Sequence, residues 1–134
     1  MSEKKFTLWN RLAAAAVFVV AAITYLLTIE PTASFWDCGE FIASSYKLEV
    51  GHPPGNPVFQ LFARFFTMFT DNMHAAVAVN AMNAICSALT IFFLYLTIVF
   101  LARRIIKPSE DGSYATGRAV AIFGAGAVGA LAYT

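Results

Sequence analysis

The sequence predicts an all-α membrane protein, and its composition and two uncharged segments are the observations that predict it. Hydrophobic residues make up 59% of the chain and charged residues 13%, whereas about 25% of the residues in a typical soluble domain are charged. Residues 12–29 and 75–102 contain no charged residue. Because about 20 residues of helix cross a bilayer core about 30 Å thick, we expect a transmembrane helix in each segment.

The first segment has a competing interpretation as a cleaved export signal. A basic start, an apolar stretch and the small residues at 32–34 are typical of such signals. The apolar stretch at 12–29 is nevertheless longer than the usual 7–15 or so residues of an export signal. Glu30 followed by Pro31 also suits a helix that leaves the membrane. We therefore expect a span rather than a signal.

A third apolar segment, residues 119–134, is interpreted as a span that is cut short. Residues 1–134 would then be the N-terminal portion of one membrane domain, with oligomerisation as the alternative. Polar and small residues support either possibility, because they pack against other helices and have no use facing lipid. They are Asn80, Asn83, Ser87, Thr90 and Thr97 in the second span, and Gly124, Gly126 and Gly129 in the last segment.

Basic residues set the expected orientation in the membrane. They gather before the first span and after the second, at Lys4, Lys5, Arg11, Arg103, Arg104, Lys107 and Arg118. Residues 30–74 hold more acidic than basic residues. The positive-inside rule places the N-terminus and residues 103–118 in the cytoplasm and residues 30–74 outside. The net charge of +1 and the lack of a basic patch give no indication of nucleic-acid binding.

The outer segment is expected to begin with a short helix at the membrane surface. Ser34 is a candidate N-cap, with Asp37 three residues later. Polar residues then recur at helical spacing, at Asp37, Glu40, Ser44 and Lys47, with Phe35, Ile42 and Tyr46 on the opposite side. Such a helix would hold two carboxylates toward water or a cavity.

A second outer helix is expected at residues 57–69. Asn56 would cap it, and Pro57 suits its first position because the missing proline N–H has no helical partner there. One face would carry Phe59, Phe62, Phe66 and Phe69, and the other Gln60, Arg64 and Thr67. The segment is too short to span a bilayer, so an interfacial helix is expected, with the phenylalanines in packing or membrane anchoring.

The motifs WDCGEF at residues 36–41 and GHPPG at residues 51–55 carry a family resemblance. They resemble the N-terminal signature of the membrane proteins grouped as domain of unknown function 2723, which are common in bacteria of the Bacteroidetes type. An animal relative of this group, transmembrane protein 260, is a protein O-mannosyltransferase. The resemblance implies a multi-pass GT-C glycosyltransferase of the bacterial inner membrane. It also implies a polyprenyl-phosphate sugar donor and an essential acidic residue in the first outer loop.

Asp37 is the first candidate for that acidic residue. Sugar transfer to a hydroxyl needs a base, and a carboxylate just outside the membrane can meet both a water-borne acceptor and a lipid-borne donor. The competing role is capping of the helix N-terminus. Glu40, one turn later, could orient the acceptor, ligate a metal or be solvated.

The other candidate residues would bind the donor. His52 could bind its phosphate, join Asp37 and Glu40 at a metal, or have a structural hydrogen-bonding role. The spacing matches no specific metal site, so no metal ligand is assigned and a divalent metal is left open. Lys47 and Arg64 could each neutralise phosphate or act as interfacial cations.

Two functions from different classes follow. The first is the N-terminal part of a glycosyltransferase that acts on protein hydroxyls, with the lipid-linked sugar, the acceptor protein and further transmembrane helices as partners. This chain alone would then be inactive. The second is a non-catalytic membrane protein, a transporter segment or assembly subunit that binds a solute or partner. Asn80 and Asn83 would then matter more than Asp37, because polar residues at membrane depth often mark a translocation path.

Overall fold

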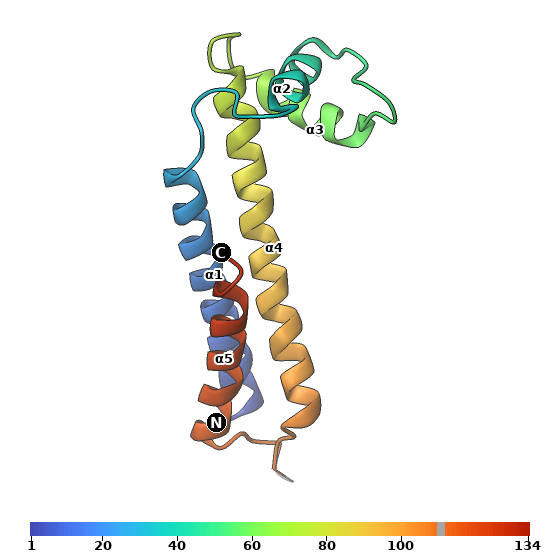
Figure 1. Cartoon of the computed structure of the whole chain (residues 1–134). Helices are drawn as coiled ribbons and strands as arrows, with labels where there is room; N and C mark the ends of the chain where they lie inside the picture. The colour runs from blue at the N-terminus through green and yellow to red at the C-terminus, as the bar shows by residue number, and fades with distance from the viewer. Residues whose placement is uncertain (110–111) are drawn as a thin grey trace. The chain divides into compact units, whose positions relative to one another are not determined.

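The computed structural model describes residues 1–109 and 112–134, and its regular elements are helices (Figure 1). In chain order they are α1 (Glu3–Leu27), α2 (Cys38–Lys47), α3 (Pro57–Thr67), α4 (Ala75–Ile105) and α5 (Thr116–Leu131). The described residues form no strand, which confirms the predicted all-α class. Helices were expected in all five of these places, although the observed helices differ from the expected ones in some of their first residues.

Two helices, α1 and α4, are long and apolar enough to cross a membrane. They contain 25 and 31 residues, which correspond to lengths of about 38 and 47 Å. Only 17% of the most apolar stretch of α1 and 28% of that of α4 are buried, whereas the core helix of a soluble protein is mostly buried. Apolar side chains on such exposed faces are suited to lipid, as expected of a membrane protein.

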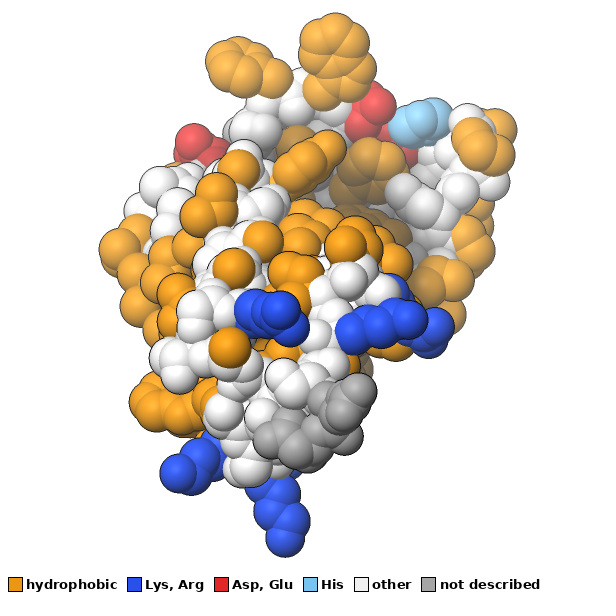
Figure 2. Space-filling view, turned by 90° about the horizontal axis from the view of Figure 1, so that it is seen from below, with side chains coloured by type: hydrophobic (Ala, Val, Ile, Leu, Met, Phe, Trp, Pro, Cys, Tyr) orange, Lys and Arg blue, Asp and Glu red, His pale blue; other side chains and the backbone are white. Residues whose placement is uncertain are grey.

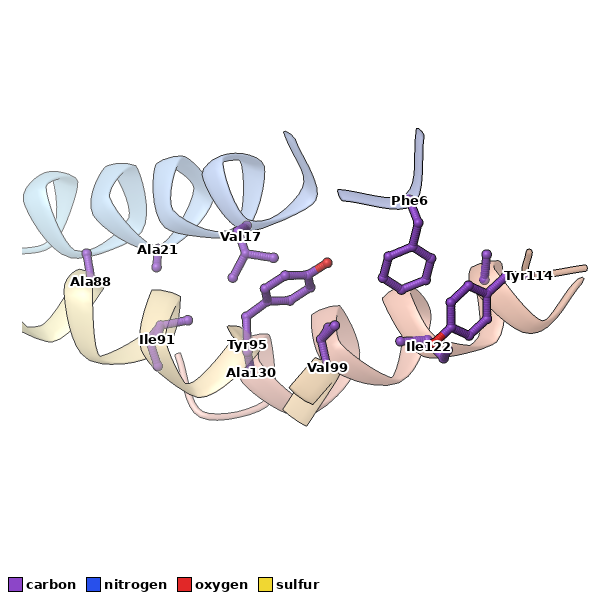
Figure 3. Packing of buried hydrophobic residues seen from close by; sticks show 12 residues of the cluster. Phe6, Val17, Ala21, Ala88, Ile91, Tyr95, Val99, Tyr114, Ile122 and Ala130 are labelled. Atoms are coloured by element: carbon purple, nitrogen blue, oxygen red, sulfur yellow. The ribbon is translucent and has the colours of Figure 1, made fainter. Parts of the chain in front are cut away.

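The chain divides into two units, and the first consists of Met1–Tyr25 and Ser87–Thr134. It contains most of α1, the later part of α4, and α5. Figure 3 shows Val17 and Ala21 of α1 directed toward Ile91 and Tyr95 of α4. The Tyr95 hydroxyl donates a hydrogen bond to Asn10 Oδ1 at 3.1 Å, so this buried hydroxyl has the partner that a buried polar group needs.

Two of the three glycines singled out in α5 allow close packing against α4. A Cβ on Gly126 would lie 2.8 Å from Val99 Cγ2, and one on Gly129 would lie 2.8 Å from Ile98 Cδ1. These contacts agree with the predicted role of small residues between helices. Gly124 does not take part, because a Cβ there would meet no described heavy atom within 4 Å apart from those of its chain neighbours and its own helix backbone.

Aromatic and charged side chains join the ends of the helices in this unit. The Arg103 guanidinium lies over the Phe6 ring and donates to Glu3 Oε1 at 2.6 Å. Phe6 stacks on Tyr114 with 4.6 Å between ring centroids. Figure 2 looks onto this end and shows Lys and Arg side chains projecting among hydrophobic ones. The basic residues that predict a cytoplasmic end are thus partly structural, since one of them ties α1 to α4.

The second unit, Leu26–Cys86, contains α2, α3 and the first turns of α4. Its core consists of Ala63 from α3 with Val79 and Met82 from α4, and partly buried Ile42, Phe59, Phe66 and Cys86 surround it. Because the residues predicted to carry chemistry, Asp37 to Arg64, all belong to this unit, its local packing determines their arrangement.

The sequence prediction for α3 named its two faces but left open which of them is buried. Gln60, Ala63 and Thr67 face the interior, whereas Phe62, Phe65 and Phe69 are exposed. Pro57 does occupy the first turn, but the Asn56 side chain makes no capping hydrogen bond. The apolar face of a soluble helix packs inward, but a helix that borders lipid can reverse this arrangement.

Candidate active site

The start of α2 presents Asp37 as an exposed carboxylate. Trp36 has a φ of 67°, a left-handed conformation that interrupts the helix. The helix therefore begins at Cys38, and the prediction that Ser34 caps it was wrong: the Ser34 hydroxyl instead donates to Cys38 Sγ at 3.3 Å. Asp37 occupies the N-cap position, but its side chain makes no capping hydrogen bond. Its carboxylate is thus not engaged in the structural role that competes with catalysis.

Glu40, in the first turn of α2, holds the loop between α2 and α3 through His52. The His52 backbone N–H donates to Glu40 Oε1 at 2.7 Å, and His52 Nδ1 lies 2.9 Å from Glu40 Oε2. Both carboxylate oxygens are therefore occupied by one residue. With Nδ1 directed at Glu40, Nε2 is the ring nitrogen that remains for another partner.

Gly51 provides the space for this contact. A Cβ at this position would lie 3.3 Å from Glu40 Oε1 and 3.1 Å from Gln60 Nε2. Both distances are shorter than an ordinary van der Waals contact, so a side chain here would displace the carboxylate or the amide. The glycine of the GHPPG motif thus lets the backbone at His52 approach Glu40 closely.

The contact shifts the pKa of both partners. The hydrogen bonds from the His52 backbone and ring lower the pKa of Glu40. The hydrogen bond to Glu40 and its negative charge raise the pKa of His52, and the charge of Asp37 raises it further. These shifts favour the carboxylate form of Glu40 and the imidazolium form of His52, and both side chains are accessible to solvent.

The other predicted polar residues of α2 and α3 serve packing. Ser44 was expected on the polar stripe of α2; it is buried, and its hydroxyl accepts a hydrogen bond from Gln60 Nε2 at 3.2 Å. The Arg64 guanidinium donates to the Tyr46 carbonyl and lies over the Tyr46 ring. A cation is favourable there because the carbonyls at the end of α2 carry partial negative charge.

Lys47 lies at the end of α2, near Glu49 and not near Asp37. Its Nζ is 3.8 Å from Glu49 Oε1, and both side chains are mostly exposed. Of the five predicted site residues, the structure therefore brings together Glu40 and His52, with Asp37 close enough to influence the charge of His52. Lys47 and Arg64 each have another nearby partner, and their roles as phosphate ligands remain predictions.

A small cavity of about 150 Å³ borders the start of α2. Its lining residues are Cys38, Phe41, Ile42, Phe59, Val79, Asn80 and Asn83. Asn80 Nδ2 donates to the carbonyls of Glu30 and Thr32, at 2.7 and 3.1 Å. This asparagine thus fixes the segment that leads into α2, a role that its place in a polar helical stripe did not predict. Among the described residues, no group of three His, Cys, Asp or Glu could hold a metal ion.

Comparison with known proteins gives the family. The model described as the protein O-mannosyl-transferase TMEM260 N-terminal domain matches residues 37–134. The chain belongs to this family. The match begins at Asp37 and includes Glu40, Lys47, His52 and Arg64, so the whole candidate site lies in the TMEM260 N-terminal domain. The resemblance predicted from the two motifs is confirmed.

Two relatives from distant organisms show how much of the chain is shared. The protein O-mannosyl-transferase tmem260 of Dictyostelium discoideum is 30% identical over 84 residues, which are 61% of this chain and 10% of that protein. The protein O-mannosyl-transferase TMEM260 of Mus musculus is 31% identical over 87 residues, 65% of this chain and 12% of that protein. The chain spans about a tenth of the length of these curated relatives. No solved structure matches it.

Proposed function

We propose that this chain is the N-terminal part of a membrane glycosyltransferase of the GT-C type. The enzyme would move a mannose-like sugar from a lipid-phosphate carrier to a hydroxyl group of an acceptor protein. The observation that carries the proposal is the Asp37 carboxylate, which is exposed and makes no capping hydrogen bond at the start of α2. Membership of the TMEM260 family, whose curated relatives are named O-mannosyl-transferases, supports the type of reaction.

Asp37 would act as the general base. The acceptor oxygen forms a bond to the anomeric carbon of the sugar while the bond from that carbon to the phosphate oxygen breaks. The bonding electrons leave with the lipid phosphate, and the hydroxyl proton goes to Asp37. A base needs a carboxylate oxygen that the acceptor can reach, and Asp37 has one.

His52 would stabilise the leaving phosphate. Glu40 occupies its Nδ1 and raises the pKa of the ring, so the imidazolium form persists to higher pH. Its Nε2–H could then donate to a phosphate oxygen, where a charge-assisted hydrogen bond favours the negative charge that develops as the sugar departs. Glu40 would act through His52 and is therefore a positioning residue.

Asn80 and Asn83 are the span residues on which the transporter alternative relies, and the contacts of Asn80 favour a structural role for this one of them. An asparagine that lines a translocation path needs an amide directed at the solute. The Asn80 amide instead donates to the carbonyls of Glu30 and Thr32 in its own unit.

The test compares Asp37→Asn with Glu49→Gln in the intact protein that carries this segment. A positioned base typically contributes about 10²–10⁴-fold in rate, so Asp37→Asn should lose sugar transfer on that scale at matched expression. Glu49→Gln is the matched control, because Glu49 is an exposed carboxylate of the same unit that forms a 3.8 Å ion pair with Lys47. If the Asp37→Asn protein keeps the wild-type transfer rate, Asp37 is not the base.

A further inference from the structure

The outward face of α3 and the turn after it is apolar along its whole length. It consists of Val58, Leu61, Phe62, Phe65, Met68 and Phe69, which we call the α3 apolar face. Leu61 is 64% exposed, Phe65 57% and Phe69 75%, whereas Ala63 on the inner face is 0% exposed. A continuous apolar surface of this kind is unusual in contact with water and indicates a binding surface.

The hydrogen-bonding side chains of α3 all turn away from this face. Gln60 donates to Ser44, and Arg64 donates to the Tyr46 carbonyl. The Thr67 hydroxyl donates to the Arg64 carbonyl at 3.0 Å. The helix therefore presents no charge and no polar side chain outward, so a partner of this face must itself be apolar.

The packing of α3 on α4 indicates that this partner is the bilayer. Ala63 contacts Val79 and Met82, which lie about 6 and 10 Å from the start of α4. At about 47 Å, α4 exceeds a bilayer core of about 30 Å by about 17 Å. If this excess is shared between its two ends, Val79 and Met82 lie at the edge of the hydrocarbon region.

We infer that α3 lies flat in the membrane interface, with the α3 apolar face inserted at the boundary between headgroups and acyl chains. Its 11 residues are too few to cross the bilayer. Because the face carries no Lys or Arg, the insertion depends on apolar burial and not on anionic lipid. This inference does not depend on the proposed glycosyltransferase function.

Spin labels on the whole chain in phosphatidylcholine vesicles test the inference. Cys38 and Cys86 are first replaced by alanine, and single cysteines are then introduced as Phe65→Cys, Leu61→Cys and Glu49→Cys. Glu49 is the control, because it is an exposed polar position of the same unit. Collision rates with oxygen, which concentrates in lipid, and with a water-soluble nickel chelate are measured at each label.

Labels at Phe65 and Leu61 should collide more with oxygen than with nickel, and the label at Glu49 should show the reverse. Adding anionic phosphatidylglycerol should leave the depth at Phe65 unchanged. Higher collision with nickel at both positions would show that water covers the face. Low collision with both reagents would show that protein covers it, and either outcome overturns the inference. Circular dichroism confirms folding, and two labelled positions guard against a local effect of one substitution.

Discussion

Replacing Gly126 by alanine should weaken the packing of α5 on α4, whereas the same replacement at Gly124 should not. A Cβ at Gly126 would lie 2.8 Å from Val99 Cγ2 and 2.9 Å from Tyr95 Cε2. Neither neighbour can move easily, because both side chains are buried in the core of this unit and the χ1 angle of a helical valine is restricted. A Cβ at Gly124 would meet no described heavy atom within 4 Å apart from those of its chain neighbours and its own helix backbone.

Two contributions to the free energy of unfolding decide how the two variants compare. One contribution is common to both variants, and the other applies to Gly126→Ala alone. Alanine is favoured over glycine in a helix interior by about 1 kcal/mol, and both variants receive this gain. Only Gly126→Ala overpacks the core, which typically costs about 1–3 kcal/mol. The free energy of unfolding should therefore be lower for Gly126→Ala than for Gly124→Ala by about 1–3 kcal/mol. Gly129→Ala should lie between them, because its Cβ would meet the end of the Ile98 side chain.

Titration with sodium dodecyl sulfate from dodecyl maltoside micelles measures this difference. The near-ultraviolet circular dichroism of the aromatic core follows loss of tertiary packing, and the far-ultraviolet signal shows whether the helices persist. Gly126→Ala should unfold at a lower mole fraction of sodium dodecyl sulfate than Gly124→Ala. Equal midpoints for these two variants would refute the close approach of α5 and α4.

Three further predictions concern the outer unit. The His52 ring should titrate above the ordinary histidine pKa, and Glu40→Gln should lower the pKa of His52, as measured by NMR. The ion pair is lost as pH rises through the raised pKa of His52 or falls through the lowered pKa of Glu40. Gly51→Ala should also lower the pKa of His52, whereas Gly39→Ala, whose Cβ would meet only Ala33 at 3.9 Å, should leave this pKa unchanged. If His52 titrates equally in both variants, a side chain at position 51 does not displace the Glu40 carboxylate. Asn80→Leu should speed amide hydrogen exchange at residues 30–36, because it removes hydrogen bonds worth about 0.5–1.5 kcal/mol each. Asn83→Leu is the control and should leave this exchange unchanged. If exchange stays slow in Asn80→Leu, Asn80 does not fix this segment.

The long helices could be predicted from the sequence, because a helix that crosses a bilayer must be apolar over many consecutive residues. A segment without charge that is long enough to span predicts α1 and α4 almost regardless of its detailed order. The start of α2 could not be predicted in this way, since it depends on the backbone of one residue, Trp36. A capping pattern read from Ser34 and Asp37 contains no information about that left-handed conformation.

The buried face of α3 could not be predicted, because periodicity gives the faces of a helix but not which of them is buried. Phe65 was absent from the predicted phenylalanine stripe, yet it is central to the exposed face. The sequence offered a hydrogen-bonding role for His52 only as one of several alternatives and did not name Glu40 as its partner, because that contact depends on the path of the connecting loop. The only local signal of the contact is Gly51, whose missing side chain leaves space for the carboxylate.

One difference between Asp37 and Glu40 favours Asp37 as the base of the proposed reaction. Both oxygens of Glu40 accept hydrogen bonds from His52, and these bonds lower its pKa. To accept a proton, Glu40 would have to release His52. The His52 imidazole would then lose the carboxylate that favours its charged form. Asp37 can accept a proton without breaking a capping bond, because it makes none. In the proposed reaction the two carboxylates would therefore have different tasks: Asp37 would take the acceptor proton, and Glu40 would hold His52 and favour its charged form. Glu40→Gln should then act through His52, so adding it to a His52→Gln variant should cause little further loss of activity.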